Sequence, residues 1–401
     1  MAQSEPRFAH SPLRLVVSAG LTIGLVIMGD SLLYNLLPLE AAGLGISLPL
    51  VGILLSANRI VRLASNAWMS AVFERFGPRL PFIAAAALGL ATTLVYGAGW
   101  GAAAFLAARL GWGIAWSALR QGGYQAVWTD GSDVKGRHMG LVWGIVRMGS
   151  AISVVAGGFL RDRFGYNVAV WAVACAGVLG IPVALSMRWP ASQRATRAPN
   201  GAPASGWGEA FRDRRRRLIL AAGLADSLFE GVIVSTASLF LAGVLGSANG
   251  ALDIGIGLGT LGGMLLAVRW TSDLIFGPAF GALSDRLGQP RTAVLLSCAL
   301  LAATGGAAAA RGLAAALGMA LMFVIGAGLN IVLGTLANGL ALRAERPHLF
   351  VGVYTTATDA GLALGPIVAY AVGGASRLPA LYVAIVLLIT LAVIAFRRAG
   401  R

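Results

Sequence analysis

The sequence predicts an all-α membrane protein whose twelve transmembrane helices form two pseudo-symmetric six-helix bundles. Of its 401 residues, 57% are hydrophobic and only 12% are charged, whereas soluble domains carry about 25% charged residues. Twelve apolar runs are long enough to cross a bilayer, which takes about 20 residues. A single long polar segment divides these runs into six and six.

The predicted spans follow one another with short connections. The first six cover residues 14–38, 48–72, 80–99, 102–127, 139–160 and 167–187, and the second six cover 218–243, 254–279, 292–311, 313–341, 350–373 and 379–397. Cys175 and Cys298 lie inside these apolar runs, so we expect small core residues and neither a disulfide nor a metal site.

The polar segment Arg188–Arg217 ends in four consecutive arginines. We therefore predict a first domain at residues 1–187, a basic cytoplasmic linker at 188–217 and a second domain at 218–401. The net charge of +15 is spread over short loops rather than gathered in one basic domain. This distribution argues against nucleic-acid binding and fits the excess of Lys and Arg in cytoplasmic loops.

The side of the membrane on which each loop lies follows from the same rule. Outside the spans, only Arg161, Arg163, Arg311 and Arg377 fall on the side opposite the termini. Both termini are therefore predicted to be cytoplasmic. The chain contains a single lysine and many arginines, a composition that suggests a bacterial protein, so we expect a monomer in the bacterial inner membrane.

The two halves repeat each other at matching places. Gly29–Tyr34 in the first span corresponds to Ala225–Glu230 in the seventh, with Asp-Ser-Leu at the same positions. Glu74–Gly77 after the second span corresponds to Asp285–Gly288 after the eighth. Matching positions in matching spans indicate an internal duplication.

Several motifs together resemble the major facilitator superfamily over the whole chain. Gly281–Arg291 reads GALSDRLGQPR, a close match to the loop motif of that family, and the first copy departs from it at Ser70 and Glu74. Arg109 with Gly113, and the segment Gly157–Gly165, resemble further family motifs. The resemblance implies the twelve-helix fold of that superfamily.

Within the superfamily, the chain resembles bacterial drug–proton or metabolite–proton antiporters, with one departure. Such antiporters often carry Gly-Pro just before the Gly-Gly of the fifth helix, where this chain has Ser153-Val154. A Gly365-Pro366 pair occurs in the eleventh span instead. The sequence therefore does not decide whether the protein belongs to the antiporter subclass.

The two copies of the loop motif are predicted to form a gate. Glycine permits a tight turn between two helices, and a carboxylate near a helix N-terminus is stabilised by the helix dipole. Such contacts can break and reform when two bundles rock against each other. The predicted gate residues are Glu74, Arg75, Gly77, Gly281, Asp285, Arg286 and Gly288.

Charged residues inside the predicted spans indicate a polar cavity, because charges in the bilayer core survive where they face water or one another. Arg59 and Arg62 lie on one helical face, and Arg269 and Asp273 are four apart and able to pair. We predict substrate binding by Arg59, Arg62, Asn66, Arg109, Arg147, Arg269 and Asn330, and proton coupling by Asp30, Asp226, Glu230 and Asp359.

The expected function is secondary active transport of a small, anionic organic solute by alternating access, as proton-coupled export. Import or uniport of an organic anion stays open, as does a structural or sensory protein that keeps the fold. The three histidines lie in termini or loops without a partner nucleophile, so we expect no enzyme. The expected partners are the solute, protons and lipid, with no cofactor.

Overall fold

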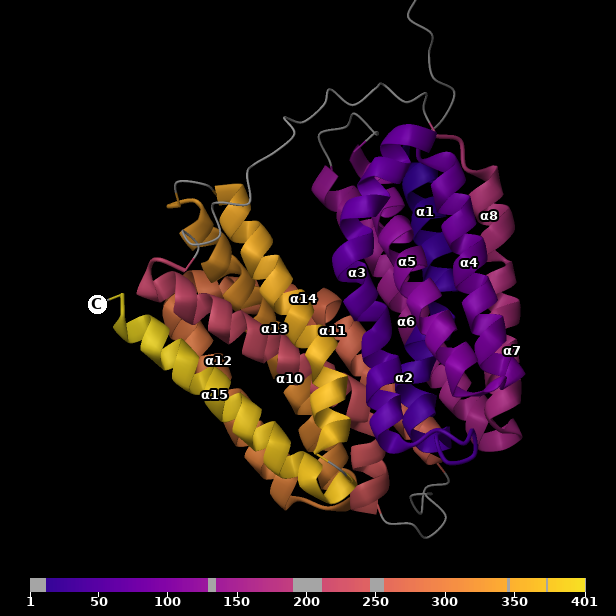
Figure 1. Ribbon diagram of the computed structural model, residues 1–401. Coiled ribbons are helices and arrows are strands. Elements are labelled where there is room, and N and C mark those ends of the chain that lie inside the picture. The colour runs from indigo at the N-terminus through magenta and orange to yellow at the C-terminus, as the bar shows by residue number, and fades with distance from the viewer. Residues whose placement is uncertain are drawn as a thin grey trace, which may run out of the picture.

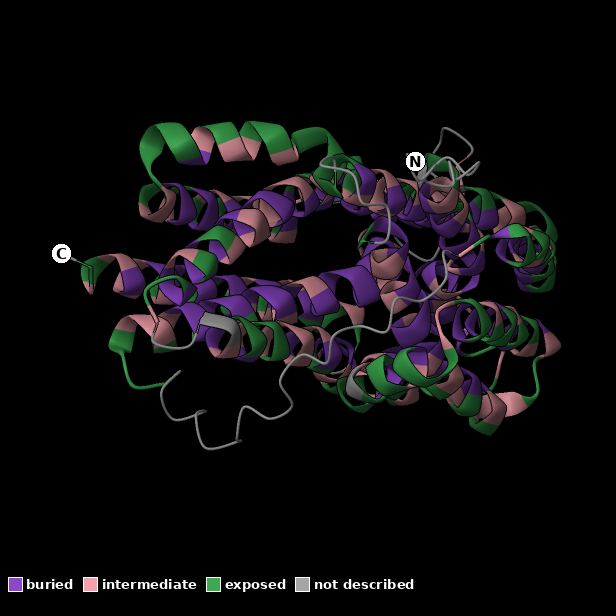
Figure 2. Cartoon of the chain, turned by 90° about the horizontal axis from the view of Figure 1, so that it is seen from above, coloured by how far each residue is buried: buried purple, intermediate pink, exposed green. Residues whose placement is uncertain are grey.

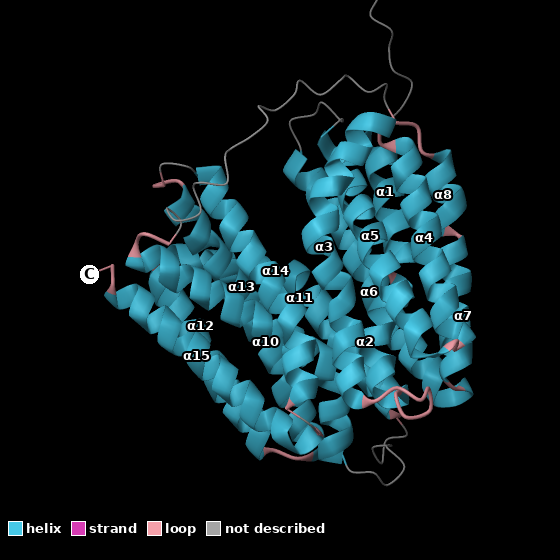
Figure 3. Ribbon diagram, in the orientation of Figure 1, coloured by secondary structure: helices cyan, strands magenta, loops and turns pink. Residues whose placement is uncertain are grey.

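The computed structural model describes residues 12–128, 135–189, 211–245, 256–344, 347–372 and 374–400. Within these ranges the regular structure is helical throughout, and no strand occurs in them (Figure 3). The all-α fold that the sequence predicts is therefore confirmed.

The helices of the first half cover each of its predicted spans. They are α1 (Pro12–Val26), α2 (Met28–Glu40), α3 (Leu48–Phe76), α4 (Arg79–Ala98), α5 (Gly101–Trp128), α6 (Lys135–Phe164), α7 (Tyr166–Val178) and α8 (Gly180–Ser186). The pairs α1–α2 and α7–α8 are each nearly continuous and each make one candidate membrane span.

The helices of the second half follow the same pattern. They are α10 (Arg214–Leu245), α11 (Leu258–Leu287), α12 (Gln289–Ala309), α13 (Gly312–Ala341), α14 (Pro347–Ala371) and α15 (Leu378–Arg398), with the short 3-10 helix η2 (Ala375–Arg377) before α15. The predicted domain boundaries stay a prediction, since most of the proposed linker lies outside the described residues.

Ten spans in the described residues are long and apolar enough to cross a membrane. With α11 and α14, which reach 30 and 25 residues, they account for the twelve predicted spans. These two helices fall short in hydropathy rather than in length. Arg269 and Asp273 lie in α11, and the polar run Thr355–Asp359 lies in α14, so both helices carry polar residues at membrane depth.

The eighth span was predicted at residues 254–279, but the helix α11 runs from Leu258 to Leu287. It continues through Pro278 and through the loop motif, and it ends at Gly288, whose φ is +84°. Gly77 ends α3 in the same way with φ +71°. Because L-residues rarely adopt positive φ, both turns require glycine, as the duplicated motif predicts.

The helices form two bundles, α1–α8 and α10–α15, that lie side by side (Figure 1). They meet along four helix pairs, which are α6 with α11, α3 with α14, α2 with α10 and α2 with α11. Buried residues gather where helices meet, and exposed residues lie on the outward faces (Figure 2). The ribbons of the two bundles diverge toward the end at which α8 ends (Figure 1).

Small residues permit the close approach of α6 and α11. A Cβ added at Gly158 would collide with the carbonyl oxygen of Gly259, and one added at Gly263 would collide with that of Val154. At the other end of the same interface, Gly144 lies beside Leu274, and no cross-bundle neighbour lies near Gly140. The two helices are thus tightly packed at the α11 N-terminus and separate toward the opposite end.

Candidate functional site

A small pocket opens between the two bundles. Arg59, Arg62 and Asn66 of α3 and Arg120 of α5 line one wall, and Asp359 and Leu362 of α14 line the other. The pocket therefore collects three guanidinium groups from the first bundle opposite one carboxylate from the second. Three of the predicted substrate-binding residues and one predicted proton-coupling residue meet there.

The position of Asn66 is fixed by α5. The Ser117 hydroxyl donates to the Asn66 side-chain oxygen at 2.8 Å, so its amide nitrogen stays available as a donor. The Arg62 guanidinium lies 6.0 Å from the centre of the Trp116 ring. The pocket wall is thus held by contacts between α3 and α5.

Asp30 forms an ion pair with Arg109 rather than with the arginines of α3. Arg109 is fully buried, and it also donates to the Leu54 carbonyl oxygen at 2.9 Å. Asn58 donates to the same Asp30 oxygen at 3.2 Å. In this conformation Arg109 therefore binds the Asp30 carboxylate and a backbone carbonyl of α3. Asp30 in turn links α2, α3 and α5.

Tyr34 lies one helical turn beyond Asp30 and connects this ion pair to the pocket. Arg59 donates from Nε to the Tyr34 hydroxyl at 3.2 Å. The guanidinium carbons of Arg59 and Arg109 each lie 5.6 Å from the Tyr34 ring centre. A change of charge at Asp30 would therefore change the electrostatic potential at Arg59, which lines the pocket.

The second bundle holds its predicted residues in a different arrangement. Asp226, the counterpart of Asp30 in the duplication, accepts a hydrogen bond from Asn330 at 3.0 Å and is buried. Arg269 instead pairs with Glu230 at 2.6 Å and with Asp273 at 3.2 Å. The pairing of Arg269 with Asp273 that their spacing predicts is confirmed.

One ion pair in this group joins the two bundles. Arg147 of α6 lies 3.7 Å from Asp273 of α11, and its guanidinium is 5.3 Å from the Trp270 ring centre. Glu230, Arg269, Asp273 and Arg147 thus form a continuous series of charges from α10 to α6. A ligand anion at Arg147 would compete with Asp273 and so act directly on the interface between the bundles.

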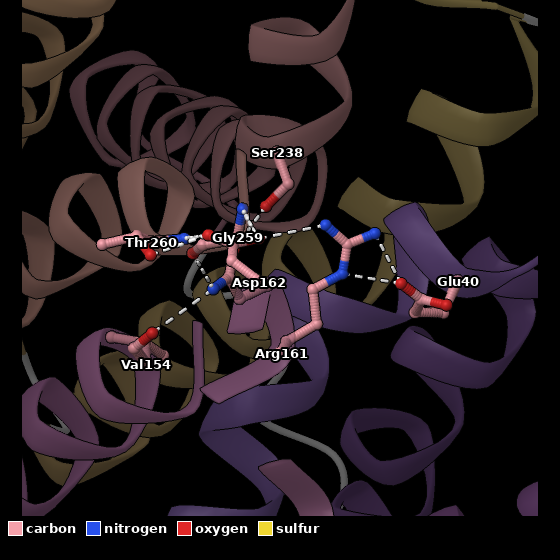
Figure 4. Close-up of polar contacts among 8 residues, drawn as sticks. Glu40, Val154, Arg161, Asp162, Ser238, Gly259 and Thr260 are labelled. Carbon is pink, nitrogen blue, oxygen red and sulfur yellow. Dashed lines mark hydrogen bonds and ion pairs between the residues drawn. The ribbon is translucent and has the colours of Figure 1, made fainter. Parts of the chain in front are cut away.

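The end of the interface at the α11 N-terminus is closed by a second set of polar contacts (Figure 4). Asp162 of α6 accepts hydrogen bonds from the backbone N–H groups of Gly259 and Thr260, at 3.0 and 2.7 Å. The Thr260 hydroxyl also donates to Asp162, at 2.7 Å. Arg161 pairs with Glu40 of α2 at 2.7 Å and with Asp162 at 3.1 Å.

Asn35 adds a buried contact one layer deeper. Its amide nitrogen donates to the carbonyl oxygens of Val154 and Gly259, at 3.3 and 2.8 Å. Its side-chain oxygen accepts a hydrogen bond from Ser238 of α10 at 2.7 Å. We call the contacts of Asn35, Glu40, Arg161, Asp162 and Thr260 the interbundle seal.

The gate residues that the sequence predicts lie at the opposite, diverging end. Glu74 and Arg75 of α3 are exposed, as are Asp285 and Arg286 of α11. Among the described residues, no ion pair joins Glu74 or Asp285 to a partner. The assigned gate role is therefore untested by this conformation, in which that end is open.

Sequence reasoning did not assign a role to the seal residues. One signal was present, because Asp162 lies in the last turn of α6, where the dipole of its own helix disfavours an acid. Such an acid is stabilised by a partner, here the N-terminus of α11. Asn35 carried no such signal, since an asparagine in an apolar span fits many kinds of helix contact.

Comparisons with known proteins identify the family. A family model described as Major Facilitator Superfamily matches residues 19–274, more than half of the chain. The chain belongs to the major facilitator superfamily. It is accordingly an integral membrane protein and a secondary transporter of a small molecule rather than an enzyme, and its recognition from sequence is confirmed.

Solved structures of this superfamily share the fold. One is the nucleoside transporter NupG, with a TM-score of 0.78 and 12% identity, covering 97% of this chain and 99% of that one. Another is a bacterial homolog of the human lysosomal transporter Spinster, inward-facing and occupied, with a TM-score of 0.69, 15% identity and coverages of 99% and 98%. No curated protein sequence matches this chain significantly.

Proposed function

We propose that this transporter exports a small, anionic organic solute across the bacterial inner membrane, driven by protons. The observation that supports an anion is the pocket wall formed by Arg59, Arg62 and Arg120. Guanidinium groups bind carboxylate and phosphate oxygens with paired, charge-assisted hydrogen bonds. Asp359 on the facing wall suits a hydroxyl or amino group elsewhere on the same solute.

Alternating access follows from the two ends of the interface. The interbundle seal closes one end, and the helices diverge at the other, which is the end at which α8 ends (Figure 1). If both termini are cytoplasmic, this conformation is open to the cytoplasm. It would take up a solute for export, and the sequence-predicted gate at Asp285 would close the cytoplasmic end afterwards.

Proton coupling is assigned first to Asp30. Its carboxylate holds Arg109 and Asn58, and these contacts link it through Tyr34 to the pocket residue Arg59. Protonation of Asp30 would release Arg109 and alter that wall. Asp226, Glu230 and Asp359 are the further coupling candidates. Arg109, Arg147 and Arg269 are proposed to affect substrate binding through the ion pairs that they form, and Asn330 through its hydrogen bond to Asp226.

Uncoupled import or uniport of an organic anion is the second candidate. The observation that favours it is the close pairing of Asp30 with the fully buried Arg109, since a permanent ion pair would not exchange protons. The coupled mechanism requires that this pair opens during transport. The two candidates therefore differ in whether a proton gradient drives accumulation.

The anion assignment is tested by binding to purified monomer in detergent, measured by calorimetry with a panel of organic carboxylates and phosphates. Arg62→Gln and Arg120→Gln should each weaken binding of any bound anion about tenfold or more, since hydrogen bonds between charged groups contribute about 1.5–3 kcal/mol. Arg79→Gln, an exposed arginine outside the pocket, is the control. Binding of neutral or cationic solutes alone would show the anion assignment to be wrong.

Coupling is tested in proteoliposomes with the anion that binds. A proton gradient should drive its accumulation in the native protein and fail to do so in Asp30→Asn. If Asp30→Asn keeps full proton-driven transport, Asp30 is not the coupling residue. If a proton gradient has no effect on the native protein, the uncoupled candidate is correct.

A further inference from the structure

Five aromatic rings of α5 and α6 form a continuous row. Ring centres are separated by 6.0 Å between Trp112 and Trp116, 6.1 Å between Trp116 and Trp143, 5.5 Å between Trp143 and Tyr124, and 5.7 Å between Tyr124 and Trp128. These separations are those of interacting aromatic pairs. We call these five residues the aromatic row.

The aromatic row adjoins the arginine wall of the pocket. Arg62 lines the pocket and lies 6.0 Å from the Trp116 ring centre. Arg120 also lines the pocket, and it lies on α5 four residues after Trp116 and four before Tyr124. Residues four apart share one face of a helix, so the same face of α5 presents a guanidinium between two rings.

The burial of the aromatic row is graded. Trp112 is 2% exposed, whereas Trp128 is 56% exposed, and Trp116, Tyr124 and Trp143 between them are half-buried. Trp116 and Trp143 pack against the core of the first bundle with part of each ring left accessible. The half-buried rings beside Arg62 and Arg120 leave surface that a ligand can cover.

We propose that the solute carries a flat aromatic or heteroaromatic ring next to its acid group. The acid binds Arg62 and Arg120, and the ring packs on Trp116 and its neighbours in the aromatic row. This inference rests on the proposed function, which supplies the anion. The Arg62 guanidinium lies 6.0 Å from the Trp116 ring centre, so an acid bound to Arg62 would hold its own ring close to Trp116.

The first test compares acids that differ only in the ring. Phenyl phosphate is paired with cyclohexyl phosphate, and phenylacetate with cyclohexylacetate, so that charge and size stay nearly constant within each pair. Calorimetry on the purified full-length protein should give about 3- to 10-fold tighter binding for the phenyl member of the pair that binds, the range expected for an aromatic contact.

The outcomes separate this inference from the one on which it rests. Equal binding of both members of a pair would overturn the aromatic inference and leave the anion assignment standing. Binding of neither pair would overturn both. Binding of benzyl alcohol as tightly as the phenyl acids would locate the affinity in the ring and overturn the anion assignment.

The second test places the ring on the aromatic row. Trp116→Leu should abolish the preference for the phenyl member while the cyclohexyl acid still binds, which also reports that the variant is folded. Trp116→Phe should keep the preference because it keeps a ring. Trp100→Leu, at an exposed tryptophan between α4 and α5, is the control. A preference that survives Trp116→Leu would overturn the inference.

Discussion

Asp162 and Thr260 are joined across the two bundles by two hydrogen bonds of 2.7 Å, one from the Thr260 backbone N–H and one from its hydroxyl. The same carboxylate accepts the Gly259 N–H at 3.0 Å. Asp162 thereby satisfies two of the N–H groups that the first turn of α11 cannot bond within its own helix. Its negative charge also faces the positive end of that helix.

Asp162→Ala should therefore open the sealed end. Three donors of α11 lose their acceptor, and each buried donor left unpaired costs about 1–3 kcal/mol. The distance between spin labels at Ser47→Cys and Ser376→Cys, which flank the sealed end on different bundles, should shift to longer values. The native cysteines Cys175 and Cys298, which the sequence analysis expects in the core, are exposed on the outer faces of their helices and are replaced beforehand.

Arg163→Gln is the matched control for Asp162→Ala. It changes a neighbouring charge on the same helix, and its guanidinium lies over the Phe159 ring of its own helix, 6.0 Å from the ring centre. Its label distances should match those of the parent. Unchanged distances in Asp162→Ala would show that the seal does not depend on this carboxylate.

Gly158→Ala tests the close approach of α6 and α11 by sterics alone. The added methyl group would meet the Gly259 carbonyl oxygen, so the two helices must move apart. The same label pair should report an opened end, and transport should slow. Gly140→Ala on the same helix meets nothing within 4 Å and should leave both measurements unchanged.

Asp30→Asn should lower the thermal stability of the protein markedly. Arg109 is fully buried, and removing one partner of a buried ion pair costs about 3–5 kcal/mol because the other charge is left uncompensated. The double variant Asp30→Asn with Arg109→Gln should recover part of this loss, since no charge stays unpaired. Equal melting temperatures for native and Asp30→Asn protein would contradict the pairing.

Asp285→Asn should slow transport without changing the thermal stability of the protein. Asp285 is exposed at the open end, with no ion pair to another described residue. Surface substitutions of this kind change stability by no more than about 0.5 kcal/mol. If Asp285 closes the gate in the alternate conformation, transport falls while the melting temperature stays constant. Full transport activity would remove Asp285 from the gate.

Hydropathy and glycine placement predicted the fold closely. The helices start and end near the predicted bounds because spans of this length must satisfy their backbone hydrogen bonds within the bilayer. The turns at Gly77 and Gly288 followed from the duplicated motif. The largest difference is the end of α11, which was placed too early because Pro278 and the polar motif after it resemble a helix end although the helix continues.

The pairing of charges was predicted where it depends on helix spacing and missed where it depends on packing. Arg269 and Asp273 lie four apart on one helix, so their contact was visible in the sequence. Asp30 pairs with Arg109, which lies 79 residues away on α5, and no spacing in the sequence indicates this partner. Which helix supplies that partner depends on how α2, α3 and α5 pack.

The sequence alone determined that this chain spans a membrane, that it consists of two related halves, and that charges occur at membrane depth. These properties follow from the composition of the chain, the spacing of its apolar runs and the repetition of its motifs. All three can be read along the chain without knowing which helices pack together. Tertiary structure decided that Arg59, Arg62 and Arg120 share one wall, that Asp162 caps α11, and that the aromatic row adjoins them. Contacts between helices far apart in the chain depend on rotation and tilt, which hydropathy does not specify.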